Sequence, residues 1–399
     1  MYRINRRWIN KLIDQIISLF FKSQKRMFAG NAIAPIKNWA VDGKITLTVG
    51  IDIGGSGLRI RLVNHMKPEE IVDLPHVKAQ STEECVQVFK NLIETIHEVA
   101  GQFESKGAAL ALAGPIKDGV CLLTNWPGEP QDRTIKIVDL PNEICPHDKT
   151  VFLNDLEAGA YGVIAADDQK IIGTLFEQLW SHVASKGKIV SDSRTAVLAM
   201  GSGLGAALIL KSPMLDDPLV LPTELGHMQI PVVCKEDPTC KEEYELIQHI
   251  SNHYYDGKQT PEFEDIASGR GLCLAYQFFV KKNQNKVLPV DQINAGQVAE
   301  QARQGDKTAK QALTWHYKVF MRSAKAVATS LVCDSVILAL DNQVKNAWFV
   351  NAIADQLHDE FYNFIRPDWM NGIRVYAQSK VLNFNLLGTA YVAEQITHQ

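Results

Sequence analysis

The 399-residue sequence contains no run of about 18 or more apolar residues, so it lacks a segment long enough to cross a membrane as a helix. It also lacks a regular cysteine framework, because its 7 cysteines lie scattered among unrelated neighbours. We interpret them as reduced thiols, which are typical of a cytoplasmic protein. An excess of basic residues is missing as well, since the formal net charge is -4. We therefore expect no nucleic-acid partner.

What the sequence does have is the composition of a folded globular protein, with 46% hydrophobic and 22% charged residues. Its length allows two domains with large cores. Short apolar stretches such as 45–52 and 195–199 alternate with stretches of helical periodicity such as 82–102 and 386–396. This alternation predicts an α/β fold.

The first 28 residues differ from the rest of the chain. Asp14 is their only acid, and the basic residues are Arg3, Arg6, Arg7, Lys11, Lys22, Lys25 and Arg26. Apolar residues from Trp8 to Phe20 recur at helical spacing, which predicts an amphipathic helix with a basic face. Such a helix suits a membrane surface or a partner protein. Two alternatives stay open: a helix packed on the body of the protein, or upstream sequence before a start at Met27.

A first glycine-rich turn lies between two predicted strands, and its residues are Asp52, Ile53, Gly54, Gly55, Ser56 and Gly57. Glycines let backbone N–H groups approach phosphate oxygens. The turn is not a P-loop, because no Gly-Lys-Ser/Thr follows, and not a Rossmann turn, because a strand follows instead of a helix. Asp52 could hold Mg²⁺ through water, which Mg²⁺ gives up reluctantly. The alternative is a plain β-hairpin turn.

A second turn of the same kind contains Gly201, Ser202, Gly203, Leu204 and Gly205, again between apolar strands. Glycine turns are permissive, so one of them is weak evidence for a phosphate site. Two of them in the same strand–turn–strand setting indicate phosphates bound by two related domains.

Polar residues follow two further predicted strands. Asp155, at the end of the strand 151–153, is placed to act as a general base, and Asn154 beside it can both donate to and accept from a hydroxyl. The alternative is that this pair caps the following helix. Glu224 and His227, in the stretch 223–227, are suited to gripping sugar hydroxyls. The rival there is a zinc site with His227, Cys234 and Cys240, whose spacing fits no strong zinc template.

Taken together and in this order, these motifs resemble the bacterial glucokinase family of the hexokinase/actin/Hsp70 superfamily, over about residues 46–396. Further matching segments are Ala113-Gly114-Pro115-Ile116 with Thr124-Asn125, the stretch from Glu264 to Leu272, and the closing Leu387-Gly388-Thr389-Ala390. The resemblance implies a two-domain actin-like ATPase (ribonuclease H-like) α/β fold with an inter-domain cleft. We expect an extension at 1–45, a small domain at 46–155 completed by the helix 384–399, and a large domain at 156–383.

The resemblance also implies an activity, namely ATP-dependent phosphorylation of glucose at its 6-hydroxyl by a cytoplasmic, glycolytic homodimer. Asp155 would be the catalytic base. The implied sugar contacts are Asn125, Asn154, Asp155, Glu224, His227 and Glu264. The implied ATP contacts are Asp52, Gly54, Gly55, Ser56, Gly57, Gly201, Ser202, Gly203 and Gly205, with Asp52 also holding Mg²⁺.

One segment departs from the family pattern. The family's adenosine motif usually contains a Gly-Gly pair, whereas residues 337–343 contain no glycine and place a bulky Leu340 there. Asp341 or Asn342 would then contact the ribose. The departure leaves two alternatives open: a kinase for another hexose or phosphoryl donor, or a sugar-binding regulator without catalysis.

Overall fold

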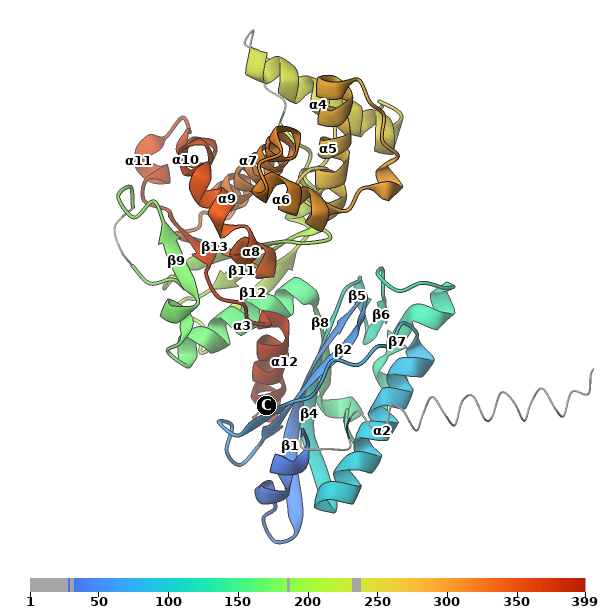
Figure 1. Ribbon diagram of the computed structural model, residues 1–399. Helices are drawn as coiled ribbons and strands as arrows, with labels where there is room; N and C mark the ends of the chain where they lie inside the picture. The colour runs from blue at the N-terminus through green and yellow to red at the C-terminus, as the bar shows by residue number, and fades with distance from the viewer. Residues whose placement is uncertain (1–27, 29–31, 185–186, 232–237, 399) are drawn as a thin grey trace, which may run out of the picture. The chain divides into compact units, whose positions relative to one another are not determined.

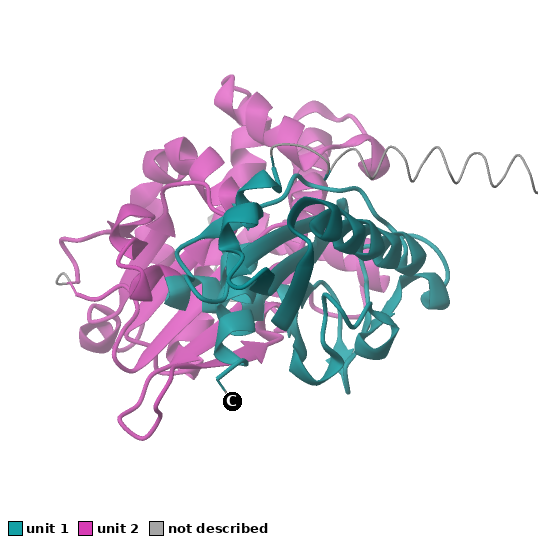
Figure 2. Ribbon diagram, turned by 90° about the horizontal axis from the view of Figure 1, so that it is seen from below, with its two compact units in different colours: residues 1–165, 384–399 teal, residues 166–383 magenta. Residues whose placement is uncertain are grey.

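The computed structural model describes residues 28, 32–184, 187–231 and 238–398. The predicted N-terminal helix lies outside these residues, so its role stays a prediction, as does the homodimer. The chain divides into two compact units (Figure 2): unit 1 is Met1–Ala165 with Phe384–Gln399, and unit 2 is Ala166–Asn383. The boundary predicted at residues 155/156 lies at the start of helix α3 (Asp155–Asp168), whereas the division falls later in that helix, after Ala165.

Unit 1 is built on a five-stranded sheet (Figure 1). Its strand order is β3 (Ile71–Asp73), β2 (Gly57–Asn64), β1 (Lys44–Gly54), β4 (Gln102–Leu112) and β8 (Thr150–Asn154). Strands β1, β4 and β8 are parallel, and β1 and β2 form an antiparallel hairpin. A small three-stranded sheet accompanies it, made of β5 (Ile116–Lys117), β6 (Val120–Leu122) and β7 (Thr134–Lys136).

Helices α2 (Thr82–Ala100) and α12 (Phe384–Gln395) cover opposite faces of this sheet (Figure 1). Since side chains alternate along a strand, Val49 and Ile51 of β1 join the core that contains Phe89 of α2. Gly50, between them, faces α12, where an added Cβ would lie 2.5 Å from the backbone nitrogen of Ala390. The closing helix therefore packs directly on the backbone of β1.

Unit 2 is built on a six-stranded sheet. Its order is β12 (Leu219–Thr223), β11 (Leu204–Leu210), β10 (Arg194–Met200), β13 (Ser335–Ala339), β14 (Arg374–Gln378) and β9 (Phe176–Leu179). The helices of this unit are α4 (Pro238–Tyr255), α5 (Gly269–Gln284), α6 (Ala295–Arg303), α7 (Lys307–Ser330), α8 (Asp341–Lys345), α9 (Ala347–Ala352), α10 (Ala354–Tyr362) and α11 (Pro367–Met370). Leu198 of β10 and Phe320 of α7 belong to a large core in this unit.

The two sheets share one topology. In unit 1 the hairpin β1–β2 is extended by the parallel strands β4 and β8, and in unit 2 the hairpin β10–β11 is extended by the parallel strands β13 and β14. Each glycine turn therefore occupies the same place in its own sheet. This confirms the predicted α/β fold.

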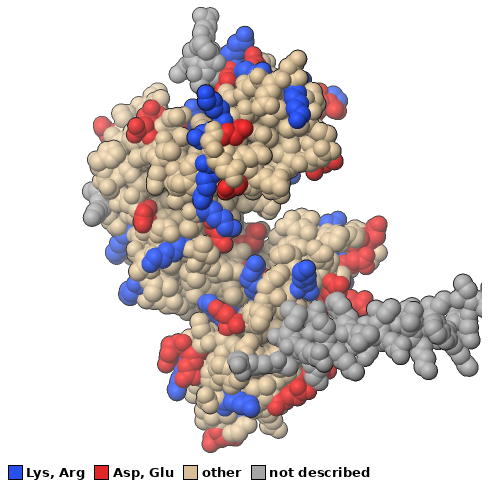
Figure 3. Space-filling model, viewed as in Figure 1, with Lys and Arg blue, Asp and Glu red and all other residues tan. Residues whose placement is uncertain are grey.

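Charged side chains are mixed on the surface. On the face that Figure 3 shows, Lys and Arg are interspersed with Asp and Glu in both units, in keeping with the net charge of -4. Among the helices that the structure describes, none is long and apolar enough to span a bilayer.

Candidate functional site

In unit 1, three parallel strands end at one edge of the sheet. Register pairs Ile53 of β1 with Leu112 of β4, and Leu112 with Asn154 of β8. The glycine turn that follows β1 and the Asp155 that follows β8 therefore lie at the same edge. Sequence spacing alone could not show this, because the strands are about a hundred residues apart and their order is a property of the sheet.

The first glycine turn is tied to the residues around it. Asp52 is buried, and its two carboxylate oxygens lie 3.3 Å from Arg59 Nη1 and 3.4 Å from Asn385 Nδ2. Trp126 Nε1 donates to the carbonyl oxygen of Gly54 at 3.1 Å. An added Cβ on Gly55 would lie 3.3 Å from Asn125 Cβ, so the predicted sugar contact Asn125 lies beside the predicted phosphate turn.

Arg59 was missed by the sequence reasoning. Its guanidinium adds a positive charge two residues beyond Gly57, on the strand β2 that leaves the turn. The sequence could have indicated it, because a tight hairpin centred on residues 55 and 56 pairs Arg59 with Asp52, as the register shows.

Asn154 and Asp155 do cap helix α3, as the alternative interpretation held. The Leu156 N–H donates to Asn154 Oδ1 at 2.9 Å and to Asp155 Oδ1 at 2.8 Å. Glu157 Oε2 accepts the N–H of Asn154 at 3.2 Å, and burial raises the pKa of the Glu157 carboxyl. Asp155 itself is exposed. Capping thus fixes its orientation while its carboxylate stays accessible, so the two interpretations are compatible.

In unit 2, the second glycine turn is held by backbone hydrogen bonds. The Gly201 N–H donates to Gly203 O at 2.8 Å, and the Gly269 N–H, at the start of α5, donates to Gly201 O at 2.9 Å. Glu264 Oε2 accepts the Leu204 N–H at 2.9 Å. A Cβ on Gly203 would lie 2.7 Å from that same Glu264 oxygen, so a side chain there would displace the Glu264 carboxylate from the turn.

Glu264 thus has a structural role besides the predicted one. Its other oxygen, Oε1, accepts from Arg270 Nη2 at 2.6 Å, and its side chain is only 15% exposed. The residue expected to contact sugar therefore also supports the second glycine turn, and Arg270 balances its negative charge.

His227 lies between two carboxylates. Its Nδ1 is 2.6 Å from Glu262 Oε2, and its Nε2 is 3.7 Å from the largely exposed Glu224. The hydrogen bond to Glu262, aided by nearby carboxylates, raises the pKa of the His227 imidazole. Glu262 was not predicted, because the sequence shows only an acid near Glu264 and gives it no partner.

The rival zinc site finds no support within the described residues. In that part of the chain, no group of three or more His, Cys, Asp or Glu side chains could hold a metal ion. Cys234, one of the three ligands considered, lies outside it.

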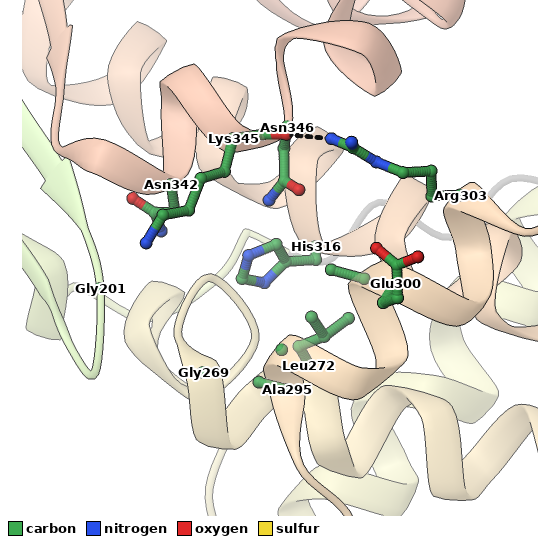
Figure 4. Close-up of a pocket in the computed structure, with 12 residues that line it drawn as sticks. Gly201, Gly269, Leu272, Ala295, Glu300, Arg303, His316, Asn342, Lys345 and Asn346 are labelled. Carbon is green, nitrogen blue, oxygen red and sulfur yellow. Dashed lines mark hydrogen bonds between the residues drawn. The ribbon is translucent and has the colours of Figure 1, made fainter. Parts of the chain in front are cut away.

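A cavity of about 470 Å³ opens beside the second glycine turn, entirely within unit 2 (Figure 4). Its apolar lining comes from helices α5 and α6, whereas its polar groups come from the end of α6, from α7 and α8, and from Asn346 between α8 and α9. The lining residues are Gly201, Gly269, Leu272, Ala295, Gly296, Ala299, Glu300, Arg303, His316, Asn342, Lys345 and Asn346. Of these, the sequence had suggested only Gly201 and Asn342.

Leu340 occupies the place where a glycine pair was expected, and it adopts a glycine-like conformation. Its φ of 93° and ψ of 154° lie in a region that side chains rarely enter. Its N–H donates to Gln378 Oε1 at 2.7 Å. A Cβ on Gly201 would lie 3.2 Å from Leu340 Cδ1, so the leucine side chain lies beside the glycine turn and is not part of the cavity lining.

Comparison with known proteins agrees with this geometry. A family model described as glucokinase matches residues 49–339. The chain is 55% identical to probable glucokinase 2 of Trichomonas vaginalis and 52% identical to glucokinase 1 of the same organism, covering 94% of this chain and 100% of each relative. The solved glucokinase of Balamuthia mandrillaris in complex with glucose superposes with a TM-score of 0.80 at 31% identity, covering 94% of this chain and 98% of that one. This chain belongs to the glucokinase family, and its fold is that of the actin-like ATPases.

Proposed function

We propose that this sugar kinase transfers the γ-phosphoryl group of ATP to the 6-hydroxyl of glucose. The observation that carries the proposal is the position of Asp155, an exposed carboxylate that follows β8 at the same sheet edge as the glycine turn after β1. The structural relative from Balamuthia mandrillaris was solved with glucose, and it is 31% identical over nearly the whole chain.

Asp155 accepts the proton of the 6-hydroxyl as that oxygen attacks the γ-phosphorus. A positioned general base contributes about 100-fold or more to such a step, and the rest of phosphoryl transfer depends on positioning and charge. The residues that the family resemblance implies for the other hydroxyls are Asn125, Asn154, Glu224, His227 and Glu264. Carboxylate acceptors bind hydroxyls more strongly than neutral ones do.

The triphosphate binds to the N–H groups of the two glycine turns, and the cavity beside Gly201 takes the nucleoside. Mg²⁺ fits Asp52, because this buried carboxylate offers hard oxygen ligands and is held in place by Arg59 and Asn385. No cluster of further metal ligands lies near it within the described residues, so water and phosphate would complete the shell. Bound Mg²⁺ neutralises charge on the phosphate oxygens.

The test is a coupled assay in which purified protein, Mg-ATP and glucose yield glucose 6-phosphate, followed through its dehydrogenase. We expect Asp155→Asn to lower the rate at least about 100-fold, because asparagine keeps the cap to Leu156 and loses the base. Asp168→Asn is the matched control: Asp168 is an exposed aspartate at the other end of the same helix. Glucose should still raise the melting temperature of Asp155→Asn. Near-normal turnover in that variant would contradict the assignment.

A further inference from the structure

His316 of helix α7 forms one wall of the cavity in unit 2 (Figure 4). It is only 4% exposed. Its Nδ1 lies 2.9 Å from the carbonyl oxygen of Ile266. A carbonyl only accepts, so Nδ1 carries the hydrogen and donates it.

The other ring nitrogen is then fixed as an acceptor. Burial lowers the pKa of the imidazole to about 4, so His316 is neutral near pH 7 and holds a single ring hydrogen. Because that hydrogen is on Nδ1, Nε2 presents a bare lone pair. To donate from Nε2, the ring would have to give up the bond to Ile266 or take a buried charge, and both are costly.

The remaining lining suits a purine. Leu272, Ala295 and Ala299 give the apolar surface that a flat base requires. Of the charged groups, Arg303 is already engaged: its Nη2 donates to the Lys345 carbonyl oxygen at 2.7 Å, and its guanidinium lies 5.5 Å from the ring centre of Trp348. Two lining residues have their hydrogen-bonding polarity set by the backbone: His316 through the Ile266 carbonyl oxygen, and Asn342, whose Nδ2 donates to the Met200 carbonyl oxygen.

We infer that His316 makes this cavity selective for 6-aminopurines, with Nε2 accepting a hydrogen bond from the exocyclic amine of adenine. The inference rests on the proposed function, since it takes the cavity to hold the nucleoside of the phosphoryl donor. A 6-oxopurine such as hypoxanthine or guanine places a carbonyl oxygen against the same lone pair. Such a base loses the hydrogen bond and places its carbonyl oxygen against Nε2, so that two acceptors repel each other. The cavity would thus select adenine both by attraction and by repulsion of 6-oxopurines.

The decisive series varies only the 6-position of the donor base, with glucose saturating: ATP, purine riboside triphosphate and ITP. The first offers an amine, the second only hydrogen, and the third a carbonyl. We expect kcat/KM to fall in that order, with ATP at least about tenfold above ITP, the range of one hydrogen bond plus one unpaired acceptor. Equal use of ATP and ITP by the wild-type protein overturns the inference and leaves the kinase assignment intact.

Two variants separate His316 from the rest of the cavity. His316→Asn can still donate to the Ile266 carbonyl, as Nδ1 does, and removes Nε2, so the ATP/ITP ratio should approach 1, mainly through a higher KM for ATP. His316→Gln places an amide near the position of Nε2, which both donates and accepts, so use of ITP should improve. A fully retained ratio in a folded His316→Asn protein contradicts the inference. If no sugar is phosphorylated with any donor, calorimetry with ADP and IDP decides the base preference independently of catalysis.

Discussion

Leu340 joins strand β13 to helix α8 with a backbone conformation, φ 93° and ψ 154°, that glycine alone enters without strain. Replacing it by Ala and by Gly isolates that strain, because both variants lose the side chain and both keep the N–H that donates to Gln378. The two differ only in the Cβ. At an ordinary helix position glycine is less stable than alanine by about 0.5–1 kcal/mol.

At position 340 we expect the opposite order. In this conformation alanine is strained by about 1–3 kcal/mol and glycine is not. Glycine also gives the unfolded chain more conformational entropy, which offsets part of that advantage. The net expectation is that Leu340→Gly is more stable than Leu340→Ala by about 1 kcal/mol, which is roughly 2–4 °C in melting temperature for a unit of this size.

The assay is thermal unfolding of both variants by calorimetry, with Gln356→Gly and Gln356→Ala as the control pair. Gln356 is exposed within helix α10, where the usual order should hold and alanine should be the more stable. If Leu340→Ala equals or exceeds Leu340→Gly in stability while the control pair behaves normally, the leucine is not strained. The reasoning that it replaces a glycine in a glycine-type turn would then be wrong.

Two further predictions concern ion pairs in unit 2. The pKa of His227 is raised above its ordinary value of 6.5 by Glu262, so this pair stabilises fully below about that pH and is lost as the pH rises through the raised pKa. The melting-temperature gap between wild type and Glu262→Gln should be widest near pH 6 and close by pH 9, and a gap independent of pH would contradict this. Arg322, 18% exposed on α7, bonds Glu360 at 2.6 Å and also Glu243, both 15% exposed. Arg322→Met should therefore destabilise by about 3 kcal/mol, because it leaves the partly buried Glu243 unpaired and leaves Glu360 with Lys318 alone. Urea unfolding that shows less than about 1 kcal/mol of loss would refute it.

The features that the sequence could predict are local ones. The apolar run at 45–52 and the glycines after it indicated a strand and a tight turn, and the structure has β1 ending at Gly54 and β2 beginning at Gly57. The closing helix was expected at 386–396 and is observed at Phe384–Gln395. Periodicity and turn chemistry act over a few neighbouring residues, so both can be read from one sequence.

The features that it could not predict are assembled from distant segments. The pairing of His227 with Glu262 spans 35 residues. The cavity takes its lining from the second glycine turn, from helices α5 to α8 and from Asn346. Leu340 shows a different limit. The absence of glycine suggested an obstructed nucleotide site, but a residue's identity does not fix its φ angle. In the structure Leu340 adopts a strained conformation beside Gly201, and it is not part of the cavity lining.

The shared topology explains why the same sheet edge carries different chemistry in the two units. Strand β8 in unit 1 and strand β14 in unit 2 hold equivalent places, each the second parallel strand beyond its hairpin. The residue after β8 is Asp155, an exposed carboxylate. The last residue of β14 is Gln378, a buried amide whose oxygen accepts the N–H of Leu340 and whose nitrogen donates to Lys380 O. A buried amide with both ends bonded supports a neighbouring turn and cannot take a proton, whereas an exposed carboxylate can. The equivalent edges of the two sheets therefore differ in role. In unit 1 the edge presents the proposed base, and in unit 2 it supports the turn beside the proposed nucleoside cavity.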